Sequence, residues 1–176
     1  PIFGIKVEWV MIHWVTGLIL TLAILVHTIR SVFWQSLSSM WISFRDMKEE
    51  LDNVRLGLVS PKIEQHKSGK YSAAQKLYHH LITAVILVAV VTGLIMLVKI
   101  DSPFWERNTY WLSQENWGIV YVLHGVSALI AISLIMVHIY FAFRPEKLLY
   151  TRSMILGWIT RDEFTTHHDP DRWKPE

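Results

Sequence analysis

Two histidines, His124 and His138, interrupt an otherwise apolar stretch of the chain. On an α-helix of about 3.6 residues per turn, this separation brings both imidazole rings to one face, about 21 Å apart along the axis. Imidazole is a common metal ligand, and an ionisable side chain within a bilayer is costly and usually functional. The spacing therefore predicts two cofactor-binding positions at two depths of one membrane helix.

A second pair, His13 and His27, has the same spacing near the start of the chain. Gly17 follows His13 by one turn, and its missing side chain would let a bulky group approach the backbone. Arg30 ends the same segment, where its long side chain can reach lipid phosphates or the propionate of a haem. We therefore include Gly17 and Arg30 among the candidate haem-binding residues.

The two histidine pairs complement each other if their helices run in the same direction. His13 then faces His124 at one depth, and His27 faces His138 at the other, as bis-histidine ligation of two haems requires. Carboxylates at membrane depth or a Glu-x-x-His motif would favour zinc or a di-iron site, but neither accompanies these histidines. The pattern favours haem.

Three apolar segments are long enough to carry these histidines across a membrane. The chain has 176 residues, of which 52% are hydrophobic, and its mean hydropathy is +0.29. About 20 apolar residues span a hydrocarbon core of about 30 Å. We predict transmembrane helices at about residues 8–34, 72–98 and 117–143, flanked by several of the nine Trp residues, whose rings favour the headgroup region.

The distribution of basic residues predicts the orientation. Lys and Arg concentrate in the long connector (35–71) and in the tail (144–176), whereas the short connector holds only Arg107. The positive-inside rule places the long connector and the C-terminus in the cytoplasm. The stretch before the first span then lies outside and carries no secretory signal, so we expect a further spanning helix before residue 1. Because cysteine is absent, this chain provides no disulfide, iron–sulfur ligand or covalent haem attachment.

These features predict an all-α membrane helix bundle, with residues 1–176 forming a single membrane-anchor domain. Within the long connector, Met47, Leu51 and Val54 have helical spacing, which predicts an amphipathic helix at the inner surface. We expect the end of the chain from Thr165 to form an extended arm. We expect His167 and His168 there to be surface contacts to a partner.

Several motifs together resemble the cytochrome b (gamma) subunit of membrane-bound formate dehydrogenase, one of the di-haem, four-helix anchors that reduce quinone. The resemblance covers nearly the whole chain. The motifs are Phe3-Gly4 ahead of His13, with Gly17 and Arg30 after it; GKYSAAQK at Gly69–Lys76; Thr92-Gly93; LHGVSALIAISLIMVHIYFAF at Leu123–Phe143; and HHDPDRW at His167–Trp173.

The resemblance implies a set of ligands for two haem b groups. His13 and His124 match the two ligands of the outer haem. His138 matches one ligand of the inner haem, whose partner in the family comes from the first membrane helix, and His27 is not a ligand position there. Two alternatives follow for the partner of His138: a helix before residue 1, or His27 in a three-helix protein.

The resemblance also implies a quinone site near His138. Ser72 and Ala74 stand where the family usually has Asn and Gly beside the quinone, while Gln75 is kept. The implied acceptor is menaquinone or ubiquinone.

The implied function is electron transfer from a partner dehydrogenase to quinone, in the cytoplasmic membrane of a bacterium or archaeon. The implied partners are an iron–sulfur subunit and a molybdenum or tungsten catalytic subunit, in a complex that can assemble into a higher oligomer within the lipid bilayer. Nothing in the sequence indicates nucleic-acid binding. The alternatives are a cytochrome b serving a hydrogenase or a thiosulfate or sulfur enzyme, and a haem-free structural anchor or small transporter subunit.

The substitution His27→Ala separates the two alternatives for the inner haem. If a helix before residue 1 supplies the partner of His138, the variant keeps both haems with unaltered bis-histidine absorption spectra. If His27 is the ligand, the inner haem is lost or becomes high-spin, and the first alternative is wrong.

Overall fold

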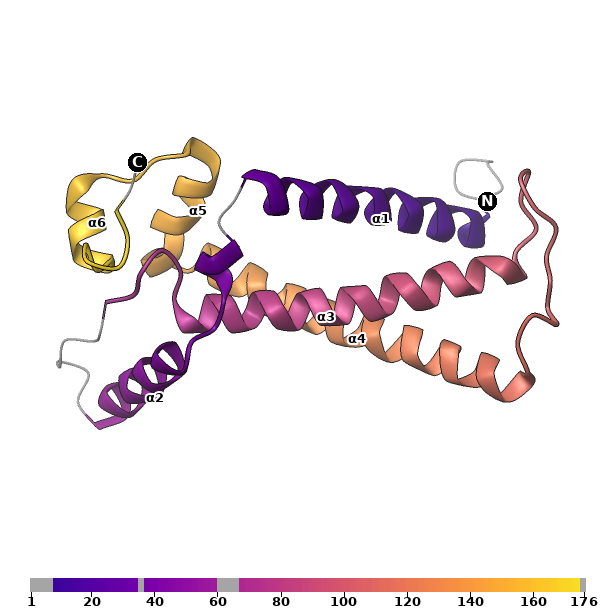
Figure 1. Ribbon diagram of the computed structural model, residues 1–176, viewed down its shortest axis with the longest axis horizontal. Coiled ribbons are helices and arrows are strands. Elements are labelled where there is room, and N and C mark those ends of the chain that lie inside the picture. Colours follow the sequence, from indigo (N-terminus) through magenta and orange to yellow (C-terminus); the bar gives the residue numbers. More distant parts are fainter. Residues whose placement is uncertain (1–7, 35–36, 60–66, 175–176) are drawn as a thin grey trace. The chain divides into compact units, whose positions relative to one another are not determined.

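The structure is a computed structural model that describes residues 8–34, 37–59 and 67–174. Its regular elements there are helices, and one isolated parallel bridge pairs Ser68 with His168. In chain order they are α1 (Trp9–Trp34), η1 (Leu37–Met40), α2 (Phe44–Val59), α3 (Ala73–Met96), η2 (Leu97–Lys99), α4 (Gln114–Phe143), η3 (Pro145–Lys147), α5 (Leu148–Leu156) and α6 (Arg161–His167) (Figure 1). The predicted all-α fold is confirmed. The Phe3-Gly4 motif lies outside the described residues.

Three of the described helices are long and apolar enough to cross a membrane. They cover Trp9–Phe33, Ala73–Lys99 and Gln114–Phe143, within a few residues of the predicted spans. Large apolar side chains are exposed along all three, including Leu22, Leu87, Leu129 and Met136. Each square ångström of such surface costs about 25 cal/mol in water, and soluble monomers rarely leave so much of it uncovered. The helices therefore require an apolar solvent.

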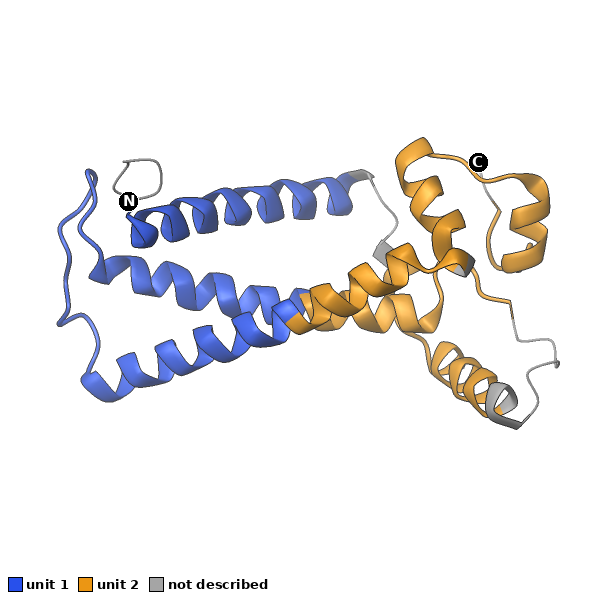
Figure 2. Ribbon diagram, turned by 180° about the vertical axis from the view of Figure 1, so that it is seen from behind, with its two compact units in different colours: residues 1–35, 83–132 blue, residues 36–82, 133–176 orange. Residues whose placement is uncertain are grey.

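The chain divides into two compact units, and α3 and α4 each contribute to both (Figure 2). The first unit contains residues 1–35 and 83–132, where α1, the later part of α3 and the earlier part of α4 run alongside one another. The second contains residues 36–82 and 133–176, with α2, the start of α3, the end of α4, and α5 and α6. The predicted single domain over residues 1–176 stays a prediction.

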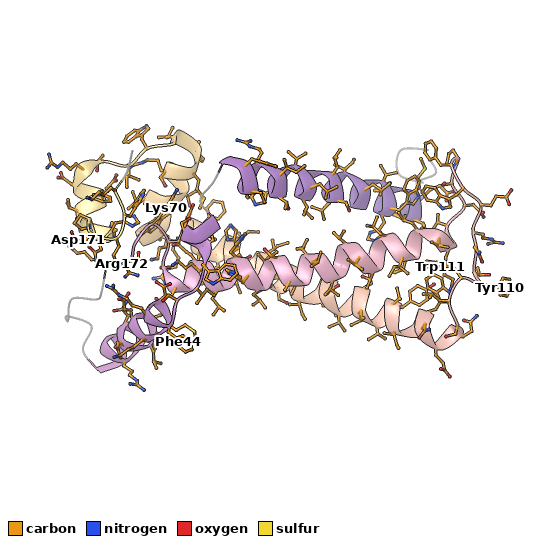
Figure 3. All side chains as sticks on the ribbon, viewed as in Figure 1. Phe44, Lys70, Tyr110, Trp111, Asp171 and Arg172 are labelled. Carbon is orange, nitrogen blue, oxygen red and sulfur yellow. The ribbon has the colours of Figure 1, made fainter. Side chains whose placement is uncertain are left out.

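Tryptophans secure the connector between α3 and α4. Nε1 of Trp105 donates to the carbonyl oxygen of Leu97 at 3.1 Å, and Nε1 of Trp117 donates to the carbonyl oxygen of Thr109 at 3.0 Å. Lys99 Nζ lies 4.6 Å from the centre of the Trp117 ring, which is 1% exposed. Each indole thus buries an apolar body and pairs its polar edge, as expected at a membrane interface. Tyr110 and Trp111 are exposed at the tip of this connector (Figure 3).

Helix α2 separates an apolar face from an acidic one. Phe44 is 93% exposed (Figure 3), and Met47, Leu51 and Val54 are exposed with it. Asp46 is 5% exposed and faces inward. The predicted amphipathic helix is confirmed, and its exposed apolar side suits the boundary of a bilayer.

The C-terminal segment differs from the predicted arm. Thr160 caps α6, because its side chain accepts from the backbone of Glu163 while the Glu163 side chain accepts from the backbone of Thr160. This capping box starts a helix that ends at His167. The expectation of an extended arm from Thr165 was therefore wrong for Thr165–His167, which form the last turn of α6.

Candidate functional site

His13 on α1 and His124 on α4 meet within the first unit. Their ring centroids are 6.0 Å apart and the ring planes make an angle of 89°. Two imidazoles that ligate one metal from opposite sides, at metal–nitrogen distances of about 2 Å, have centroids about 6 Å apart. The structure thus brings together the two histidines that the depth argument paired, at a separation that fits one iron between them.

Backbone and side-chain groups of α3 hold one nitrogen of His124. Its Nδ1 lies 3.1 Å from the carbonyl oxygen of Ala89 and 3.0 Å from Oγ1 of Thr92. Because a carbonyl oxygen can only accept, Nδ1 carries the hydrogen, and Nε2 is then the nitrogen that can bind a metal. Metal-bound histidines are typically held in this way through the nitrogen that does not bind the metal.

Small residues lie close to this pair. A Cβ on Gly93 would lie 3.2 Å from Cε1 of His124, so a side chain there would press on the ring. Ser127 and Ala131 are buried on α4 near His124. A Cβ on Gly17 would meet no described atom within 4 Å, so the backbone is open there, and the haem contact of Gly17 stays a prediction.

The donor set fits haem better than a bare metal ion. Within the residues that the structure describes, no three His, Asp or Glu side chains are grouped to hold a metal. A protein zinc site needs three or four protein ligands, whereas a haem iron brings four equatorial nitrogens and needs only axial ones. Two opposed imidazoles meet that need.

His138 has a different environment, in the second unit. Tyr78 stacks on its ring, with centroids 5.4 Å apart and planes 20° apart. The Tyr78 hydroxyl donates to the carbonyl oxygen of Leu134 at 3.2 Å, which fixes the phenol against α4. Sequence reasoning missed Tyr78. His27 and Arg30 are exposed on α1 in the other unit, so the ligand that completes a site at His138, and any propionate contact of Arg30, stay predictions.

The predicted quinone residues lie at the start of α3. Ser72 N donates to Oε1 of Gln75 at 2.8 Å, and Gln75 N donates to Oγ of Ser72 at 3.3 Å. This is a capping box, which satisfies two free donors at the helix start. Ala74 and Gln75 are exposed, and Gln75 keeps its side-chain NH₂ group for other contacts. The quinone role of Ser72, Ala74 and Gln75 stays a prediction.

Four charged residues, which we call the ionic clamp, hold the C-terminal segment and α2 against this helix start. Asp46 binds Lys76 at 2.8 Å and Arg172 at 2.9 Å, and Arg172 also binds Glu49 at 2.5 Å. Sequence reasoning missed the clamp, although Arg172 belongs to the HHDPDRW motif and Asp46 to the polar face of α2.

His168 completes the attachment of the C-terminal segment. Its Nδ1 lies 2.8 Å from the carbonyl oxygen of Gly69, and Asp169 N donates to the carbonyl oxygen of Ser68 at 2.9 Å. His168 is 5% exposed and packs on Trp173, with ring centroids 4.7 Å apart. The expectation of a surface contact to a partner was therefore wrong for His168, which binds the chain's own GKY segment.

The comparison with known proteins identifies the class of this bundle. Residues 3–157 match the profile of the prokaryotic cytochrome b561 family. The chain belongs to that family. As a family member it is a multi-pass membrane cytochrome b that binds haem b and transfers electrons, which disfavours a haem-free anchor.

One relative adds detail to the family assignment. The chain is 30% identical over 110 residues to the formate dehydrogenase cytochrome b556 subunit of Haemophilus influenzae. The aligned region covers 62% of this chain and 41% of that relative, so the chain spans less than half of the relative's length.

The ionic clamp of this cytochrome should open at acidic pH. Burial alone would raise the pKa of Asp46, but Lys76 and Arg172 lower it below its ordinary value. Burial alone would likewise raise the pKa of Glu49, but Arg45 and Arg172 lower it below its ordinary value. A lowered carboxyl pKa stabilises the fold at neutral pH, and that stabilisation is lost as pH falls below the ordinary carboxyl pKa and through the lower folded-state pKa. Hydrogen exchange at residues 168–173, corrected for intrinsic rates, should accelerate there.

The variant Asp46→Asn should release the same segment at pH 7, because it leaves two buried cations with weaker partners. Limited proteolysis should then cut after α6 at least several-fold faster. Arg45→Gln is the matched control: it removes the exposed Arg45–Glu49 pair on the same helix and should change cleavage little. Equal cleavage of Asp46→Asn and the native protein would contradict the clamp.

Proposed function

We propose that this chain is the di-haem membrane subunit that passes electrons from a partner dehydrogenase across the membrane to quinone. The observation that carries the proposal is the His13–His124 pair, 6.0 Å apart, with Nδ1 of His124 held by α3. The partner would comprise an iron–sulfur subunit and a molybdenum or tungsten catalytic subunit, as in formate dehydrogenase. The relative named as a formate dehydrogenase cytochrome supports this choice.

The proposed haem ligands lie at two depths of the membrane. His13 and His124 would hold one haem b, and His138 a second, together with His27 or with a ligand from a helix before residue 1. When bound, haem b supplies one-electron transfer between ferric and ferrous iron. Within a bilayer, the apolar surroundings of α1, α3 and α4 would exclude bulk water from the ligating rings, which favours rapid transfer with little solvent reorganisation.

Quinone would be reduced at the cytoplasmic end of the bundle. His138, Ser72, Ala74 and Gln75 are the proposed contacts, with the free amide hydrogens of Gln75 suited to a quinone carbonyl oxygen. Each quinone takes up two electrons and two protons, and protons drawn from the cytoplasm would contribute to the membrane potential. The ionic clamp holds α2 and the C-terminal segment beside this proposed site through Lys76, which follows Gln75.

Haem stoichiometry tests the ligands. In a pyridine haemochrome assay of purified protein, His124→Ala and His13→Ala should each remove one of two b-type haems, and His138→Ala the other. His167→Ala, on the exposed face of α6, is the control and should keep both. A native protein with no b-type haem would overturn the proposed function, and one haem in the native protein would overturn the di-haem assignment.

Purification from native membranes tests the partner. A mild detergent should retain an iron–sulfur subunit and a molybdenum or tungsten subunit with this chain, and formate should reduce the haem absorption bands of the complex. If hydrogen or a sulfur compound reduces the haem bands and formate does not, the partner is a hydrogenase or a sulfur enzyme instead of formate dehydrogenase. The electron-transfer role of this chain would stand in that case.

A further inference from the structure

We propose that Thr92 is a positioning residue for His124, whose ring nitrogen Nδ1 donates a second hydrogen bond to the Thr92 hydroxyl oxygen. The proposal rests on the proposed function, in which His124 ligates the iron through Nε2. Thr92 is 5% exposed on α3 and lies on a different helix from either ring of the His13–His124 pair.

The direction of the Thr92 hydrogen bond follows from its neighbours. Oγ1 of Thr92 lies 2.6 Å from the carbonyl oxygen of Val88 and 3.1 Å from that of Ala89. A hydroxyl has one hydrogen and carbonyl oxygens only accept, so the hydrogen of Thr92 goes to its own helix. The oxygen of Thr92 is then left to accept from Nδ1–H of His124 at 3.0 Å.

The reverse arrangement is disfavoured by the same carbonyl. If the Thr92 hydroxyl donated to His124, Nδ1 would carry a lone pair 3.1 Å from the carbonyl oxygen of Ala89. Two acceptors would then face each other without a hydrogen, and both polar groups would be unsatisfied beside Thr92, which is 5% exposed. Ala89 and Thr92 thus fix one tautomer together.

The next residue fixes the ring from another side. A Cβ on Gly93 would stand 3.2 Å from Cε1 of His124, so the backbone of α3 approaches the edge of the ring closely there. Thr92 therefore supplies a hydrogen-bond acceptor for the His124 ring, and the missing side chain of Gly93 leaves space for the same ring. Neither function was assigned to this dipeptide from the sequence.

A second acceptor changes the chemistry of the ring as well as its orientation. Sharing Nδ1–H between two oxygens increases the electron density on the imidazole and makes Nε2 a stronger donor. A stronger axial donor stabilises ferric over ferrous iron. Thr92 therefore lowers the reduction potential at the His13–His124 site and leaves the His138 site unchanged.

Three variants separate this role from ordinary helix packing. Thr92→Val keeps the branched shape and removes the hydroxyl, whereas Thr92→Ser keeps the hydroxyl. Thr28→Val is the matched control, because Thr28 makes the same backbone bond, at 2.8 Å to the carbonyl oxygen of Ile24, on an exposed face of α1.

Haem content and redox titration of the purified complex give independent readouts. We expect Thr92→Val to raise the midpoint potential of one haem and leave the other unchanged, while Thr92→Ser and Thr28→Val match the native protein. Full haem content with both potentials unchanged in Thr92→Val would overturn the proposal. If Thr92→Val loses one haem, Thr92→Ser decides: native haem content and potentials support the proposal, and loss of the same haem overturns it. A native protein without b-type haem would instead refute the proposed function itself.

Discussion

The hydrogen bond from His124 to the carbonyl of Ala89 is the contact on which the candidate site depends. An imidazole within an apolar helix must satisfy two nitrogens where water is scarce, and each unsatisfied polar group there costs several kcal/mol. The Ala89 carbonyl satisfies one nitrogen, and the centroid of the His124 ring lies 6.0 Å from that of His13. The close approach of Gly93 to Cε1 of His124 shows that α3 also packs against the edge of this ring.

In the second compact unit, at the end that the charge distribution predicts to be cytoplasmic, ion pairs are the dominant side-chain interactions. There α2, the start of α3 and the C-terminal segment are joined by carboxylates and cations that bury much of their surface. Charges of this kind are rarely tolerated within hydrocarbon but are favourable near water when well paired. The contrast separates the region that holds the candidate haem ligands His13 and His124 from the region that orders the loops beside the proposed quinone residues.

Much of the architecture could be predicted because bilayer solvation imposes simple rules. Span length and apolarity predicted the three long helices, and equal depth predicted that His13 meets His124. The roles of Thr92 and Tyr78 could not be predicted, since they depend on the rotation of α3 about its own axis, and no strong polar face marks that rotation. The ionic clamp joins Asp46 to Arg172 across most of the chain, so only the folded structure reveals it. The predicted arm failed because a local capping box at Thr160 outweighs the turn-rich composition that follows.

The division of α3 between two compact units has an energetic consequence. Thr92 contacts His124 in one unit and Tyr78 contacts His138 in the other, and the described hydrogen bonds and ring contacts of the two sets share no residue. Effects of substitutions at sites without shared partners generally add. The surroundings of His124 and of His138 can therefore diverge independently during evolution, so substitutions around one ring need not disturb the other.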